Sequence, residues 1–168
     1  MVPVVIETLV VGIPPSPSVV VLRPLEEHGT SSRVLPIWIG PTEAASIGIA
    51  LEGQPHMRPM THDFLANIIQ ALHADIERVV IDRVEGSTFF ATVTLDHSGE
   101  SIAVDARPSD SIALAVRTQS PLFVDEDVLN SSSFPYLFSS MTNRETALDE
   151  FKSFLESISP EDFKIQEP

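Results

Sequence analysis

Ile-Trp-Ile-Gly-Pro-Thr-Glu at residues 37–43 and Val-Asp-Ala-Arg-Pro-Ser-Asp at residues 104–110 are the two segments from which the fold of this chain can be read. Each begins as an extended segment and then places a proline, a hydroxyl residue and an acid in a row. A proline in the first turn, followed closely by an acid, is typical of a helix N-terminus. Both segments therefore predict a strand that passes directly into a helix.

The residues around these two segments repeat one plan, in which strands and hairpin turns precede each helix. Helices are expected from Pro41 to about Glu52, from Thr61 onward, and from Pro108 to about Arg117. Strands are expected at residues 2–11, 19–22, 34–39, 76–84, 88–95 and 101–106. The sequence thus predicts an α+β domain in which internally duplicated β-β-β-α units form one compact mixed-sheet core.

The character of the chain changes after Val124. Residues 130–133 are expected to form a loop, and Thr142 or Asn143 is expected to cap an acidic amphipathic helix. The apolar positions of that helix are Ala147, Leu148, Phe151, Phe154, Leu155 and Ile158. We therefore predict one domain at residues 1–130 and an acidic helical extension at residues 131–168.

Composition limits the classes of function. The chain has 168 residues and no cysteine, which excludes disulfides and thiolate zinc sites. The net charge is −14, and no lysine precedes Lys152. Such a surface repels phosphate backbones and anionic membranes, so any nucleic-acid site would depend on local arginines or on a bound divalent metal. No apolar run is long enough to span a bilayer, and we predict a soluble cytoplasmic protein that does not bind membranes.

Polar residues gather at three junctions, at residues 40–43, 58–63 and 105–110. Each junction is explained in part by helix capping, because a hydroxyl or an acid at a helix start satisfies free backbone N–H groups. Capping does not explain Asp105, which lies within a strand. It also does not explain Arg58 and Arg107, each of which directly precedes a proline beside a helix N-terminus.

These unexplained residues suggest phosphate chemistry. A guanidinium beside a helix N-terminus is a good anion receptor, so Arg58, Arg107 and Ser109 are the candidate phosphate-binding residues. Carboxylate and imidazole groups suit magnesium or manganese and can also transfer protons. The candidate catalytic residues are His62, Asp63, Asp105 and Asp110, of which Asp63, Asp105 and Asp110 are the candidate metal ligands. A structural ion pair between Arg107 and a neighbouring carboxylate is the alternative.

Three blocks of residues together resemble the signature of the bifunctional nuclease domain family, which is also known in bacteria as a domain of unknown function. The blocks are residues 35–40 with Glu43-Ala44, Arg58-Pro59 with residues 61–63, and residues 105–115. The resemblance extends over residues 2–130. It implies DNase and RNase activity, the property after which plant members are named.

The leading hypothesis is metal-assisted phosphodiester hydrolysis of DNA or RNA. The rival is a non-catalytic oligomeric module that recognises an anionic ligand or a partner protein, and the acidic charge favours it. A third possibility is that the acidic C-terminal segment masks a nucleic-acid site. Long sheet edges tend to pair, so we also expect a homo-oligomer, most simply a two-fold dimer.

Overall fold

One mixed sheet organises the protein, whose computed structural model describes residues 1–13, 16–27, 32–53, 57–135 and 153. Within these residues the sheet has eight strands in the order β6-β5-β4-β7-β1-β2-β3-β8. The strands are β1 (Val2–Val10), β2 (Ser18–Pro24), β3 (Arg33–Ile39), β4 (Ala74–Glu85), β5 (Thr88–His97), β6 (Glu100–Ala106), β7 (Leu122–Val124) and β8 (Phe134–Pro135). Neighbouring strands are antiparallel except β4 and β7, which are parallel. The prediction of an α+β fold with a mixed sheet is confirmed.

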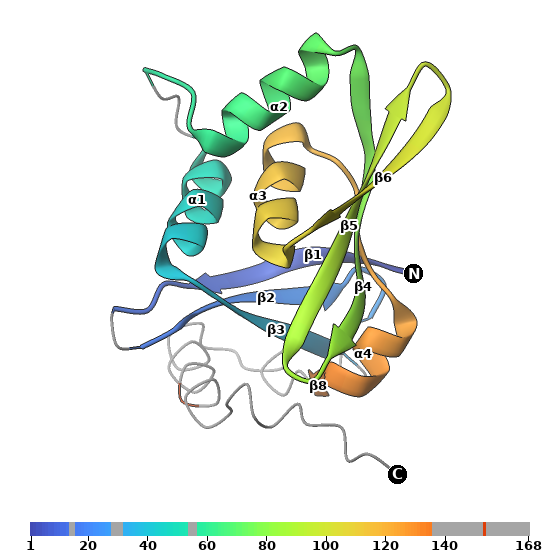
Figure 1. Ribbon diagram of the computed structural model, residues 1–168. Coiled ribbons are helices and arrows are strands. Elements are labelled where there is room, and N and C mark those ends of the chain that lie inside the picture. The colour runs from blue at the N-terminus through green and yellow to red at the C-terminus, as the bar shows by residue number, and fades with distance from the viewer. Residues whose placement is uncertain (14–15, 28–31, 54–56, 136–152, 154–168) are drawn as a thin grey trace.

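The first three helices begin at the predicted residues, Pro41, Thr61 and Pro108, whereas the fourth was not predicted. The helices are α1 (Pro41–Glu52), α2 (Thr61–Ala71), α3 (Pro108–Thr118) and a short α4 (Glu126–Ser132). Figure 1 shows β1–β3 running across the molecule and β4–β6 rising steeply, with α1 and α3 in the angle between them. Among the described residues, none of the helices combines the length and apolarity needed to cross a membrane.

Local chemistry explains where the two predicted helices of the repeat begin and end. Both α1 and α3 carry proline in the first turn, preceded by an extended residue, Gly40 or Arg107. Helix α1 ends at Gly53, whose φ of 62° lies in the left-handed region that glycine adopts without strain. Helix α3 ends at Gln119 in the same conformation, with φ of 55°.

A single hydrophobic core joins the two halves of the chain. Leu22 and Ile47 from the first half and Ile81 and Ile112 from the second half are fully buried in one cluster. Because α1 packs on α3 within this cluster, the two strand-to-helix junctions face each other. Each half has three antiparallel strands followed by a helix, and β7 lies between the halves. This arrangement is compatible with a duplication, which stays a prediction.

The expected loop at residues 130–133 is wrong for residues 130–132, which belong to α4. Asp125 caps this helix by accepting a hydrogen bond from the backbone N–H of Asp127 at 3.1 Å, while Val128 and Leu129 are buried. Helix α4 crosses the predicted domain boundary at residue 130, and Phe134 of β8 then pairs with Val34 of β3. The predicted amphipathic helix, with its positions from Ala147 to Ile158, lies outside the described residues apart from residue 153.

Candidate functional site

A network of polar side chains connects α1, α2 and α3 and contains several residues singled out from the sequence. At its centre is His62, in the first turn of α2, whose Nε2 lies 3.2 Å from Oδ1 of Asp110 in the first turn of α3. The His62 side chain is 14% exposed and that of Asp110 is 35% exposed. The packing of α2 on α3 brings this pair together from positions far apart in the sequence.

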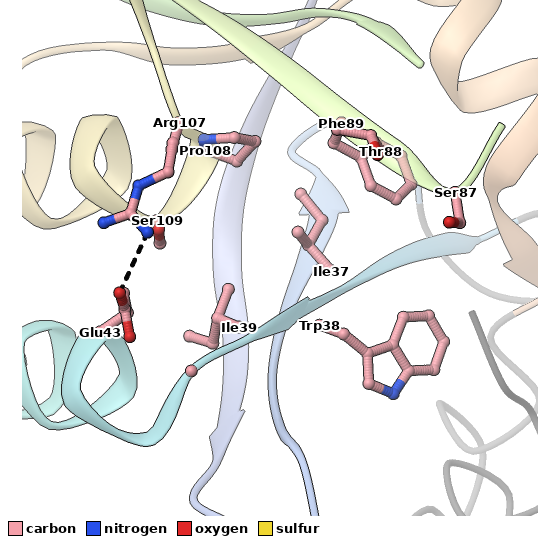
Figure 2. A pocket seen from close by; sticks show the side chains of 11 residues that line it. Ile37, Trp38, Ile39, Glu43, Ser87, Thr88, Phe89, Arg107, Pro108 and Ser109 are labelled. Carbon is pink, nitrogen blue, oxygen red and sulfur yellow. Dashed lines mark ion pairs between the residues drawn. The ribbon is translucent and has the colours of Figure 1, made fainter. Parts of the chain in front are cut away.

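Arg107 holds the other side of the Asp110 carboxylate. Its Nε donates to Oδ2 of Asp110 at 2.8 Å and its Nη2 donates to Oδ1 at 3.2 Å. Its Nη1 lies 3.2 Å from Oε1 of Glu43 on α1 (Figure 2). A Cβ atom at Gly40 would clash with the Glu43 carboxylate, so glycine leaves the space that Glu43 occupies. The Arg107 side chain is 66% exposed, and a solute can reach its guanidinium even though it is paired.

Ser46 links the opposite side of His62 to a second arginine. His62 Nδ1 lies 2.9 Å from Oγ of Ser46, which also accepts a hydrogen bond from Nη2 of Arg117 at 3.3 Å. Nε of Arg117 donates to Oδ1 of Asp63 at 2.5 Å, and the Arg117 side chain is only 8% exposed. Asp63 in turn accepts the backbone N–H of Met60 at 2.9 Å. Asp63 therefore stabilises the start of α2 and neutralises a buried cation.

The partners of Ser46 suit one neutral tautomer of His62. Because Ser46 Oγ accepts from Arg117, its hydroxyl proton is available to His62 Nδ1. The neutral tautomer of His62 that suits this arrangement carries its proton on Nε2 and donates it to Asp110. Both ring nitrogens are thus engaged, and in this state His62 holds Asp110 in place.

These contacts set the ionisation of Asp110. Partial burial raises the pKa of the Asp110 carboxyl, but hydrogen bonds from Arg107 and His62, together with the charges of the same groups, outweigh burial and hold the pKa below its ordinary value. In return, the hydrogen bond to Asp110 raises the pKa of Arg107. Asp110 is therefore a carboxylate and Arg107 a cation at neutral pH.

The lowered pKa of Asp110 predicts a pH dependence of folding. Ionised Asp110 stabilises the folded state fully above its ordinary pKa of 3.8. As the pH falls through that value toward the lower folded pKa, the unfolded chain takes up its proton first and this stabilisation is lost. The difference in the free energy of unfolding between the wild type and Asp110→Asn should therefore shrink as the pH falls through this window, as measured by urea denaturation.

The matched control for this experiment is Asp75→Asn, because Asp75 is an exposed carboxylate at the start of β4. The difference in the free energy of unfolding between this variant and the wild type should change much less over the same pH range. If the difference in the free energy of unfolding between Asp110→Asn and the wild type stays constant with pH, the ion pair of Asp110 has no stabilising role.

A cavity of about 470 Å³ opens between α2, α3, β5 and β6, and we call it the α2–β6 cavity. Asp105, Arg107 and Asp110 line one part of it. The remaining lining is mainly apolar and consists of Leu65, Ile69, Val93, Leu95, Val104, Ala106, Ser111 and Leu114. Asp105 is exposed and makes no side-chain hydrogen bond or ion pair with the described residues. It is thus an exposed carboxylate on a residue that lines this cavity.

Arg107 also borders a second cavity, of about 280 Å³, which we call the junction cavity (Figure 2). It lies where the two strand-to-helix junctions meet and is bounded by Glu43 on one side and by the β4–β5 turn at Ser87 on the other. Ser109 lines this cavity, with a side chain that is largely buried. Arg107 is therefore accessible from both cavities, whereas Ser109 borders only the junction cavity of the two.

Arg58 lies elsewhere. It lines a third cavity of about 480 Å³ between α1, α2 and the end of α3, together with Asp63, Asn67 and Arg117. Arg107 does not border this cavity. The structure therefore does not bring the two predicted phosphate-binding arginines to one cavity.

The predicted metal ligands are also divided between cavities. Asp105 and Asp110 line the α2–β6 cavity, whereas Asp63 lines the third cavity and pairs with Arg117. In the part of the chain that the structure describes, no three His, Cys, Asp or Glu side chains are grouped so that they could hold a metal ion. Two carboxylates can still suffice for magnesium, which keeps several waters and is commonly bound through one or two carboxylates and substrate phosphates.

Sequence reasoning missed Glu43, Ser46 and Arg117 as members of the network. Glu43 and Ser46 are three residues apart on α1, and Asp110 and Arg117 are seven apart on α3, so each pair lies on one helix face. For Arg117, helical spacing from Asp110 was the available signal. Ser46 is buried and unremarkable in sequence, so only its contacts identify it.

The sequence of this chain is similar to a known family and to known proteins. The family model described as "Bifunctional nuclease domain" matches residues 20–136. Two uncharacterized proteins of Mycobacterium tuberculosis, one from strain CDC 1551 and one from strain H37Rv, are each 40% identical to this chain over 167 residues. These alignments cover 94% of this chain and 98% of each relative. The matched region includes every residue of the polar network.

Proposed function

This chain belongs to the bifunctional nuclease domain family, and from that membership we propose that it hydrolyses phosphodiester bonds of DNA or RNA in the α2–β6 cavity. The observation that carries the proposal is the shared lining of this cavity by Asp105, Arg107 and Asp110. The accessible guanidinium of Arg107 would bind phosphate, and the exposed carboxylate of Asp105, two residues away in the chain, would accept a proton; hydrolysis requires both functions.

Each residue has a distinct role in the proposed reaction. Arg107 binds a non-bridging phosphate oxygen, and Asp110 orients Arg107 through two hydrogen bonds. Asp105 takes a proton from the attacking water as its oxygen bonds to phosphorus. The bond from phosphorus to the leaving oxygen breaks, and that oxygen takes a proton from solvent. His62 donates a hydrogen bond to Asp110 and holds the carboxylate in position.

The proposal includes a divalent cation because the carboxylates make the site negatively charged. The carboxylates of Glu43 and Asp110 pair with the one guanidinium of Arg107, and Asp105 adds a further negative charge to the cavity lining, so the site alone would repel a phosphodiester. Magnesium or manganese held by Asp105 and Asp110 would supply the positive charge that offsets this repulsion. Asp63 is not included in this set, because it pairs with Arg117.

The test is cleavage of single- and double-stranded DNA and RNA by the purified full-length chain with magnesium, manganese or EDTA. We expect metal-dependent cleavage that EDTA abolishes. Asp105→Ala should lose it, whereas Asp75→Ala, a change at an exposed carboxylate on β4, should retain it. Equal cleavage by the wild type and Asp105→Ala would overturn the assignment of the site. No cleavage by any of these proteins would favour a binding module.

A non-catalytic binding module is the second candidate, and two observations favour it. Both ring nitrogens of His62 have partners, so the network is complete without a substrate. The α2–β6 cavity is also lined mainly by apolar side chains, as is usual for ligand-binding pockets. Binding of short oligonucleotides or inorganic phosphate without turnover, measured by calorimetry, would support this candidate.

A further inference from the structure

The outer edge of β6 lacks most of the features that usually protect an edge strand, and its charged residues are only Glu100 and Asp105. In the described part of the chain β6 pairs only with β5, in an unbroken register from Ala91 with Ala106 to His97 with Glu100. It has no lysine, proline or bulge, which are the common devices against edge pairing. Ile102 is 40% exposed and Val104 is 43% exposed. This strand is therefore available to pair with another strand.

An exposed apolar stripe on α2 lies beside this edge. Its side chains share one face of the helix by their spacing, and they are Phe64 (59% exposed), Leu65 (41%), Ile68 (38%) and Leu72 (64%). Leu65 lines the α2–β6 cavity together with Val104, so the stripe and the strand border one hollow. We call the stripe and the edge together the α2–β6 face. A partner that pairs with β6 would also approach α2.

The α2 part of this face lacks the charged residues that occur in the rest of the chain. Residues 64–74 contain no Asp, Glu, Lys or Arg, although 20% of the whole chain is charged. Depletion of charge is typical of the core of a protein–protein interface. A membrane surface is a poor match, because interfacial helices usually carry Lys or Arg on their polar face and α2 has neither.

We propose that a second copy of this chain docks on the α2–β6 face, with the two β6 strands paired antiparallel about a two-fold axis at Ala103. Ala103 is the midpoint of Glu100–Ala106, so this register pairs the whole strand. A two-fold axis perpendicular to the sheet keeps matching faces together. The opposed pairs are Ile102 with the partner's Val104, Ser101 with the partner's Asp105, and Glu100 with the partner's Ala106.

This register is self-complementary. It sets apolar Ile102 against apolar Val104 on the face that borders α2, which is a favourable cross-strand pair. It also avoids placing the two carboxylates of the strand, Glu100 and Asp105, opposite each other. A hydroxyl faces Asp105 instead. The proposal does not depend on the nuclease activity, because it rests on the edge strand and the apolar stripe alone.

Absence of cysteine from the chain allows a direct test of the register. Directly opposed residues in an antiparallel pair are about 4.5–5.5 Å apart at Cα, which a disulfide can span. Ala103→Cys should therefore form a covalent dimer under mild oxidation, seen on a non-reducing gel. Ser101→Cys is the control, because its two copies would lie about 13 Å apart along the strands. Equal cross-linking of both variants, or of neither, would overturn the proposed register.

Sedimentation of the full-length chain tests the interface itself. The wild type should be a dimer at micromolar concentration. Ile102→Asp and Phe64→Asp should each weaken it by on the order of 100-fold, because each buries two unpaired carboxylates. Leu25→Asp is the control, since Leu25 is a 50% exposed apolar residue after β2. A monomeric wild type, or a dimer that both Ile102→Asp and Phe64→Asp leave intact, would overturn the proposal.

Discussion

Replacing Asp110 with Asn is expected to lower the rate of nucleic-acid cleavage by on the order of 100-fold or more, the typical contribution of a correctly placed acid–base or charged group. Asp110 fixes the Nε and Nη2 atoms of Arg107 through both carboxylate oxygens. Asparagine offers one acceptor in place of two and removes the negative charge. Arg107 then pairs only with Glu43 and no longer presents its guanidinium to the α2–β6 cavity.

The measurement is cleavage of a fluorescent oligonucleotide with magnesium, beside Asp75→Asn as the matched exposed control. A double-mutant cycle with Arg107→Met tests whether Asp110 acts through Arg107 or independently of it. If Asp110 acts through Arg107, the double variant should be about as slow as the slower single variant. Additive losses would show that Asp110 acts independently of Arg107. Wild-type rates in a correctly folded Asp110→Asn variant would exclude Asp110 from the reaction.

Asp63→Ala is expected to destabilise the fold by about 2–3 kcal/mol, somewhat less than the roughly 3–5 kcal/mol lost when a fully buried ion pair is broken. The substitution leaves the Arg117 guanidinium, which is 8% exposed, without its carboxylate. It also removes the acceptor for the Met60 N–H at the start of α2. The Asp63 side chain is 31% exposed, so water replaces part of the loss.

Urea denaturation measures this effect, and Asp75→Ala on β4 provides the exposed control. Adding Arg117→Met to Asp63→Ala should recover part of the lost stability, because the unpaired charge is removed. The same experiment separates a structural role of Asp63 from the metal-binding role that the sequence suggests. A variant that keeps its stability and loses only cleavage would assign Asp63 to the chemistry.

Local signals were sufficient to place the principal elements. Pro41 and Pro108, each followed two residues later by an acid, predict helices that begin where the structure has them. The polar residues that begin at Thr61 do the same for α2. The short elements after α3 were not predicted. Strand β7 has three residues and depends on β4 and β1 on either side, and α4 depends on burial of Val128 and Leu129. Elements this short are stabilised by tertiary contacts and leave little pattern in the sequence.

The amino-acid sequence was enough to predict the α+β class and the strand-to-helix junctions, because caps, turns and alternation act between residues close together in the chain. The family was indicated separately, by the resemblance of three blocks of residues to its signature. Only the tertiary structure decided which polar groups meet. His62 bonds to Asp110, and Asp63 bonds to Arg117 and so lies apart from Asp105. Those partners are set by how α1, α2 and α3 pack. Packing depends on the shape of the whole core, which no single segment encodes.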